Sequence, residues 1–124
     1  MNVVDSSSWL EFFADGPNAN FFAAPITDTA RLIVPSVSLL EVFKHILRRK
    51  GEGEALDAVA SMRGGRVIPL DESVALNAAK LGVELRLPLA DSIILATARA
   101  HQAVLWTQDS DFEGIAGVQY RAKG

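Results

Sequence analysis

The chain has 124 residues, of which 49% are apolar and 22% are charged, and this composition excludes an intrinsically disordered protein. Its net charge of −3 argues against a protein that holds nucleic acid by bulk positive charge alone, and the absence of cysteine excludes disulfides, thiolate metal ligands and cysteine nucleophiles. The sequence shows neither an apolar run of about 18 residues nor a signal-peptide pattern, so we expect a cytoplasmic protein without a membrane span.

Short apolar runs bounded by Asp, Pro, Gly or Thr predict buried strands. These runs are Val3–Val4, Leu32–Val34, Val67–Ile68 and Val104–Trp106. The segments between them are long enough for crossover helices and too long for hairpins, which favours parallel pairing. We therefore expect residues 1–124 to form a single domain of the α/β class, with helices on both faces of the sheet.

Amphipathic segments between the runs predict helices. They extend from Ser36 to about Lys50, from Gly53 to about Met62, from Asp71 to about Leu85, and from Leu89 to about Gln102. We expect Ser36 to cap the first of these helices. The segment Asp15–Asp28 contains glycine, proline and asparagine and is predicted to form a loop or lid.

Acidic residues follow the predicted strands or lie early in the helices beyond them. Asp5 directly follows the first strand, and Asp109 and Asp111 lie just after the last one. Glu41 lies in the second turn of the helix after the second strand, and Asp91 lies in the first turn of the final helix. Because the carboxyl ends of parallel strands share one edge of a sheet, this topology would bring the acids together.

Each acid also has a simpler explanation. Asp5 could cap the helix that follows it, and Asp91 could be a favourable first-turn charge. Glu41 lies on the polar face of its helix, where it could pair with Lys44. Asp109 and Asp111 could simply belong to a turn. The residue pattern alone leaves these alternatives open.

A cluster of carboxylates needs a compensating cation, because like charges a few ångströms apart repel strongly. Hard oxygen ligands without any thiolate favour Mg²⁺ or Mn²⁺, and such a site suits phosphoryl transfer. Basic side chains that could hold a phosphate chain are concentrated in one stretch of the sequence. They are Lys44, Arg48, Arg49 and Lys50.

Sequence motifs in a fixed order extend over nearly the whole chain. They are Val3-Val4-Asp5-Ser6-Ser7, Pro35-Ser36-Val37 through Glu41-Val42, Leu89-Ala90-Asp91-Ser92 through Ala98, and Trp106-Thr107-Gln108-Asp109-Ser110-Asp111-Phe112. In this order and spacing they resemble the PIN-domain ribonucleases, and most closely the VapC toxins of type II toxin–antitoxin pairs. The resemblance implies a three-layer α/β/α PIN-like fold with a central, mainly parallel sheet of four or five strands.

The resemblance also implies a function. It implies a Mg²⁺- or Mn²⁺-dependent endoribonuclease that cleaves RNA with a metal-activated water, serves as a toxin, forms a homodimer and is blocked by a VapB-like antitoxin. The acids that match the family's catalytic and metal-binding positions are Asp5, Glu41, Asp91 and Asp109. Of these, Asp5 and Asp91 are the expected direct metal ligands. The supporting positions that also match are Thr107, Asp111 and Ser6.

Two other functions stay open at this point. One is a PIN-like module that binds RNA or a protein without cleaving, and the other is a different metal-dependent phosphoesterase, suggested by the pair Asp109 and Asp111. An aromatic cluster near the start of the chain is expected to lie mainly in the core, and it could also line a groove for an antitoxin. Its members are Trp9, Phe12, Phe13, Phe21 and Phe22.

Overall fold

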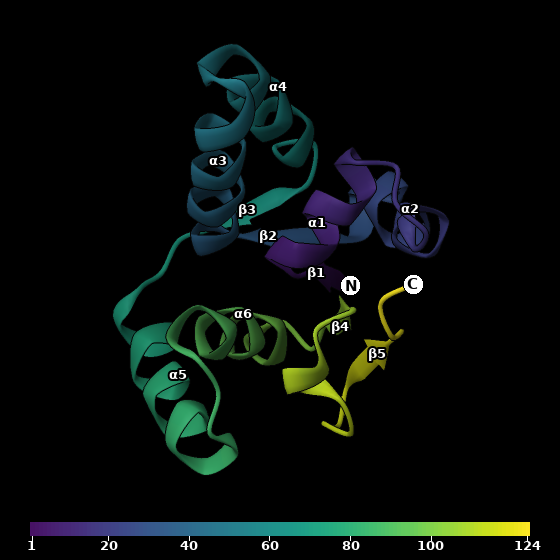
Figure 1. Ribbon diagram of the computed structural model, residues 1–124. Coiled ribbons are helices and arrows are strands. Elements are labelled where there is room, and N and C mark those ends of the chain that lie inside the picture. The colour runs from purple at the N-terminus through teal and green to yellow at the C-terminus, as the bar shows by residue number, and fades with distance from the viewer.

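The computed structural model describes residues 1–124 and contains a five-stranded sheet between two layers of helices (Figure 1). The strands are β1 (Asn2–Val4), β2 (Leu32–Pro35), β3 (Arg66–Ile68), β4 (Val104–Thr107) and β5 (Val118–Tyr120). Neighbouring strands all pair in parallel, in the order β3-β2-β1-β4-β5.

Helices connect the strands. The α-helices are α1 (Ser6–Phe13), α2 (Ala19–Thr27), α3 (Ser36–Lys50), α4 (Glu52–Met62), α5 (Glu72–Leu85) and α6 (Leu89–Ala100), and the short 3-10 helices are η1 (Thr29–Arg31) and η2 (Ser110–Phe112). In Figure 1, α5 and α6 lie below β1, β2 and β3, and α3 and α4 lie above these strands. None of these helices is both long enough and apolar enough to cross a membrane.

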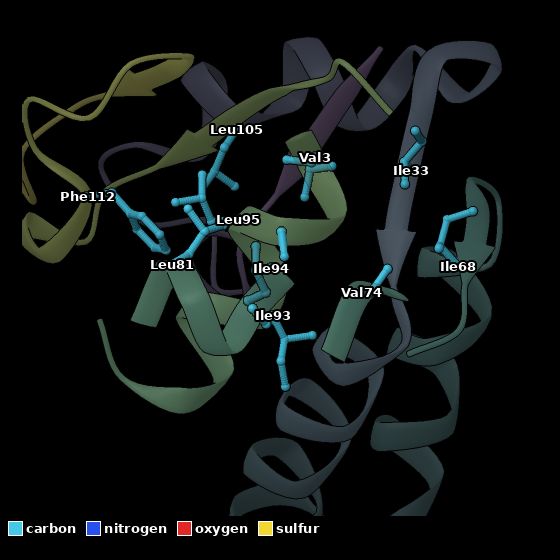
Figure 2. Packing of buried hydrophobic residues seen from close by; sticks show 13 residues of the cluster. Val3, Ile33, Ile68, Val74, Leu81, Ile93, Ile94, Leu95, Leu105 and Phe112 are labelled. Carbon is cyan, nitrogen blue, oxygen red and sulfur yellow. The ribbon is translucent and has the colours of Figure 1, made fainter. Parts of the chain in front are cut away.

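The two faces of the sheet bury alternate residues of the same strands, as the pleat requires. Val3 and Ile33 belong to the core that the sheet forms with α5 and α6, where Leu105 joins them (Figure 2). Val4 and Val34 belong to a second core on the opposite face, which α1, α2, α3 and α4 cover. The expected three-layer α/β/α fold with a parallel sheet is therefore confirmed.

The order of strands in the sheet reverses at β1. The chain passes from β1 to β2 and β3 on one side, and then crosses to β4 and β5 on the other side. In open parallel sheets, ligands bind beyond the carboxyl ends of the strands at such a reversal. Asp5 directly follows β1, and Asp109 lies just after β4, the strand that pairs with β1. Both residues therefore lie where the topology places a binding site.

The loop predicted over Asp15–Asp28 is wrong for Ala19–Thr27, which form α2. Phe22 and Ile26 lie one helical turn apart and are buried in the second core, and Pro25 is buried within the same helix. The burial of this face outweighs the low helix propensity of proline. The glycine, proline and asparagine content of the segment favours a loop, but composition alone does not show which side chains pack against the sheet.

Some boundaries also differ from the prediction. Ser36 does not cap α3: it is the first helical residue, and the cap position is Pro35, which makes no side-chain hydrogen bond. The helix predicted from Gly53 begins one residue earlier, and α6 ends at Ala100. No apolar run indicated β5, because it is a three-residue edge strand that pairs only with β4.

Candidate active site

Acidic side chains from separate segments converge at the carboxyl edge of the sheet. The charges of Asp109, Asp5, Asp111 and Glu41 all act on Asp91, in that order of strength. Carboxylate oxygens of Asp91, Asp109 and Asp111 lie within 4.8 Å of one another. The structure thus brings together the four acids that the sequence singled out, and it adds Asp111 to the group.

Asp5 is held rigidly at the end of β1 and is only 2% exposed. Its Oδ1 accepts hydrogen bonds from the backbone N–H of Ser8 at 3.0 Å and from Ser7 Oγ at 3.3 Å, and its Oδ2 accepts one from Thr107 Oγ1 at 2.5 Å. Asp5 therefore caps α1 and belongs to the acidic group at the same time. Burial raises the pKa of Asp5, against the hydrogen bonds from Ser8 and Thr107, which lower it.

Thr107 connects two of the acids. Its hydroxyl donates to Asp5 and accepts from the backbone N–H of Asp109 at 2.9 Å. Asp109 in turn caps η2, because its Oδ1 accepts from the backbone N–H of Asp111 at 2.9 Å. The turn interpretation of Asp109 is thus also correct, and the turn fixes the position of its carboxylate beside Asp91.

Glu41 is oriented toward α1. Its Oε1 accepts a hydrogen bond from Ser6 Oγ at 2.6 Å, and Ser6 is buried. The ion pairs of the structure join Arg31 to Asp28 and Lys50 to Glu54, so the alternative in which Glu41 pairs with Lys44 is wrong. Glu41 thus lies on the polar face of its helix and still belongs to the acidic cluster, because its charge acts on Asp91.

Asp91 is half-buried and lies among like charges. It lies in the first turn of α6, after Pro88 at the cap position. Burial and the neighbouring carboxylates raise the pKa of Asp91 to about 7. A bound cation would act in the opposite direction, because it favours the charged form of a carboxylate. Without a cation, the Asp91 carboxyl therefore titrates near neutral pH.

The donor set fits a hard divalent cation. Only carboxylate oxygens contribute to the close group, and no histidine belongs to it. Oxygens on opposite sides of a bound Mg²⁺ ion stand about 4 Å apart. The oxygens of Asp91, Asp109 and Asp111 all lie within 4.8 Å of one another, so one ion can reach all three. Asp5 is not a member of this close group, and both of its carboxylate oxygens accept hydrogen bonds. Asp111, which was predicted only as a supporting residue, is a member of the group.

Sequence reasoning missed a buried polar network that supports the site. Asn18 Nδ2 donates to Gln108 Oε1 at 3.1 Å and to the carbonyl oxygen of Ala122 at 3.0 Å. The backbone N–H of Gln108 donates to Ser8 Oγ at 3.3 Å. Gln108 lies within a quoted motif and could have been found there, whereas Asn18 lies 90 residues away from it and carries no local signal.

The basic residues predicted to contact RNA are all exposed on α3, but they border two different hollows. Lys44 and Arg48 line a hollow that also contains Glu41. Lys50 lines a second hollow, and Arg49 borders both. The four residues therefore do not form one uniform surface.

The second hollow is a groove of about 500 Å³ between α1, α3 and α4. Leu10, Phe13 and Ile46 give it an apolar part, and charged side chains of α3 and α4 also line it. Trp9 and Phe22, from the predicted aromatic cluster, are fully buried instead. The cluster is therefore mainly core, as expected, and Phe13 extends it to the groove.

Comparison with known proteins gives one family and several similar structures. The sequence model of the PIN domain matches residues 3–118. A toxin–antitoxin complex from Klebsiella pneumoniae is similar at 24% identity and a TM-score of 0.79, covering 96% of both chains. The VapC20 toxin of Mycobacterium tuberculosis, described as cleaving the sarcin-ricin loop, is similar at 19% identity and a TM-score of 0.75, covering 94% of this chain and 95% of that one.

A DNA-bound VapBC from Salmonella typhimurium is similar at 17% identity and a TM-score of 0.75, covering 98% of this chain and 96% of that one. Identities at this level establish a shared fold. The comparison with curated protein sequences gave no match.

Proposed function

The chain belongs to the PIN domain family, and from this premise we propose that it is a divalent-metal-dependent endoribonuclease, the toxin of a VapBC-type toxin–antitoxin pair. The convergence of acids from separate segments carries the proposal, because oxygens of Asp91, Asp109 and Asp111 lie within 4.8 Å of one another beside Asp5 and Glu41. The fold shared with toxins of known structure supports the same assignment. Residues 1–124 form one PIN domain in this proposal.

Asp91, Asp109 and Asp111 would hold the ion, which we propose is Mg²⁺ or Mn²⁺. Such an ion, when bound, supplies positive charge near the phosphodiester and acidifies an attacking water. Asp5 adds negative charge from behind the group and, through Thr107, fixes the loop that carries Asp109. This arrangement keeps the ligand oxygens in place before substrate arrives.

Glu41 has a different role in the proposal. It lies outside the close group of three acids, and its carboxylate is held by Ser6. Ser6 contacts only Oε1, and Oε2 would orient the water that attacks the phosphate and accept its proton. Basic side chains of α3 would hold the RNA backbone beside Glu41. The candidates are Lys44, Arg48, Arg49 and Lys50. We also propose that the protein acts in the cytoplasm, where such an RNA substrate would be available.

Cleavage of a long, mixed-sequence RNA transcript tests the proposal. Asp91→Asn and Asp109→Asn should abolish cleavage while circular dichroism shows an unchanged fold. Glu113→Gln is the matched control, because Glu113 is an exposed acid just beyond η2 and should leave cleavage unchanged. Binding of RNA without cleavage by the wild type would favour a non-catalytic module, and hydrolysis of small phosphoesters alone would favour another phosphoesterase.

We propose that the antitoxin occupies the groove between α1, α3 and α4. Its apolar part suits side chains of an inserted peptide segment, and its charged rim suits polar contacts. Ala14→Trp and Ser61→Trp fill the groove from exposed positions and should prevent binding of the antitoxin encoded beside this chain. Ala24→Trp, on the exposed part of α2, should not. Equal binding by all three variants would reject this location.

We also propose that the protein is a homodimer. Large apolar side chains are exposed on α5 and at the start of α6, where nothing in the single chain covers them. They include Leu76 at 63%, Val83 at 82% and Leu89 at 80% exposure. Exposed apolar residues that gather on one region of a surface are typical of a protein interface.

A further inference from the structure

The basic residues of α3 divide according to the hollow that they border. A surface hollow of about 320 Å³ is lined only by residues of α3: Leu40, Glu41, Lys44, His45, Arg48 and Arg49. One of these residues, Glu41, belongs to the acidic cluster. The hollow therefore begins at the candidate active site and continues along the helix beside positively charged side chains.

The spacing of these residues gives the hollow a direction. Glu41, Lys44 and Arg48 follow the i, i+3, i+7 pattern, which places them on one face of a helix. With a rise of 1.5 Å per residue, Lys44 lies about 4.5 Å and Arg48 about 10.5 Å beyond Glu41 along the helix axis. The two positive charges thus follow one another away from the acids.

Both charges are available to a ligand. Lys44 and Arg48 are exposed, and neither forms an ion pair. Lys50, in contrast, lies 3.8 Å from Glu54 and borders the groove between α1, α3 and α4. An extended polyanion that enters the acidic site would therefore meet Lys44 and Arg48 in succession, and it would not meet Lys50.

We propose that the RNA strand leaves the active site along α3, so that Lys44 and Arg48 contact successive phosphates on one side of the scissile bond. This inference rests on the proposed ribonuclease function. The rise of about 6 Å from Lys44 to Arg48 is close to the spacing of successive phosphates along an RNA strand, so each side chain can contact one phosphate. Contacts of this type position the strand and carry no sequence information.

Steady-state cleavage and salt-dependent binding measure the contribution of each charge. Lys44→Gln and Arg48→Gln should each raise KM about two- to fivefold on the long transcript and leave kcat unchanged. In an Asp91→Asn background, each should also reduce the slope of log K against log salt by about 0.7. The matched controls Lys80→Gln and Arg63→Gln remove exposed charges on other elements and should change neither quantity.

Crosslinking tests the direction of the strand. The chain has no cysteine, so Lys44→Cys and Arg48→Cys each introduce a unique thiol that can carry a photocrosslinker. In the Asp91→Asn background, crosslinks from both positions should map to the same side of the cleavage site, with the one from position 48 further from the scissile bond. Crosslinks on opposite sides, or in the reverse order, would overturn the proposal.

The outcomes distinguish failure of the proposed ribonuclease function from failure of the proposed RNA path along α3. If the wild type neither binds nor cleaves RNA, the ribonuclease proposal fails and this inference fails with it. If the wild type cleaves RNA but Lys44→Gln and Arg48→Gln behave like Lys80→Gln and Arg63→Gln, only the path along α3 is rejected.

Discussion

The hydroxyl of Thr107 lies 2.5 Å from Oδ2 of Asp5 and joins the ends of two neighbouring strands that are 102 residues apart in sequence. The same hydroxyl accepts a hydrogen bond from the backbone N–H of Asp109. One buried side chain therefore sets the relative position of two acids that no local interaction connects. Its loss should disturb the site more than its small size indicates.

Replacement of Thr107 by valine keeps the shape of the side chain and removes the hydroxyl. Because buried Asp5 then loses a hydrogen-bond donor, Thr107→Val should lower the free energy of unfolding by about 1–3 kcal/mol at neutral pH. RNA cleavage should also fall. Thr107→Ser restores the hydroxyl and should recover most of the cleavage, measured beside denaturant unfolding. Equal cleavage by the valine and serine variants would show that the hydroxyl does not position the acids.

The raised pKa of Asp91 makes the stability of the metal-free protein depend on pH. The folded-state pKa of about 7 lies above the ordinary value of 3.8, so the folded protein binds the proton more tightly than the unfolded chain. The stabilisation is complete below pH 3.8 and is lost as pH rises through about 7. Asp5, whose pKa is also raised, acts in the same direction.

Denaturant unfolding between pH 5 and pH 8 in the presence of EDTA measures this dependence. Asp91→Asn removes the titrating group and should reduce the loss of stability with rising pH. It should therefore be more stable than the wild type at pH 8. Glu113→Gln, which removes an exposed acid, is the control and should follow the wild type. If Asp91→Asn and the wild type lose stability equally between these pH values, Asp91 does not titrate in this range.

The hydrogen bond from Ser6 to Glu41 gives a kinetic prediction. Ser6→Ala leaves the carboxylate of Glu41 in place chemically but removes the group that orients it. Losses of about 10- to 100-fold are typical when a residue that orients a catalytic group is removed, so we expect kcat on RNA to fall within that range with little change in KM. Ser73→Ala, an exposed serine in α5, should have no effect. A change confined to KM would contradict the orienting role.

The apolar surface of α5 and α6 predicts the oligomeric state. Val83→Asp and Leu89→Asp place charges on exposed positions that the proposed dimer covers, so both variants should shift the protein from dimer to monomer. Light scattering after size-exclusion chromatography measures the mass. Leu56→Asp, at an exposed position of α4, should remain dimeric. A wild type that is monomeric at micromolar concentration would reject the homodimer.

Much of the fold could be predicted from local patterns in the sequence. Alternate burial of Val3 and Val4 requires a strand covered on both faces, and the acids after β1 and β4 lie at the edge to which a parallel sheet brings them. Asp91 lies in the first turn of α6, and its carboxylate is close to those of Asp109 and Asp111. The meeting of the acids was therefore predictable from topology.

Other features depend on contacts between distant segments. Glu41 is oriented toward α1 because Ser6, 35 residues earlier, donates to it, and helical periodicity alone placed it on the polar face. The segment with Pro25 forms α2 because Phe22 and Ile26 meet the sheet. Likewise Asn18 supports Gln108 across 90 residues. No pattern within a single segment contains these relationships.

Calorimetric titration of the metal-free protein with Mn²⁺ tests the central claim most directly, because it asks whether acids of separate segments form one cation site. The wild type and Glu113→Gln should bind Mn²⁺ with equal affinity, and Asp91→Asn and Asp109→Asn should bind it far more weakly. The affinity of the wild type should increase from pH 6 to pH 8, because the ion competes with the proton on Asp91. Binding of Mn²⁺ that is equal in all four proteins, or absent from the wild type, would contradict the account.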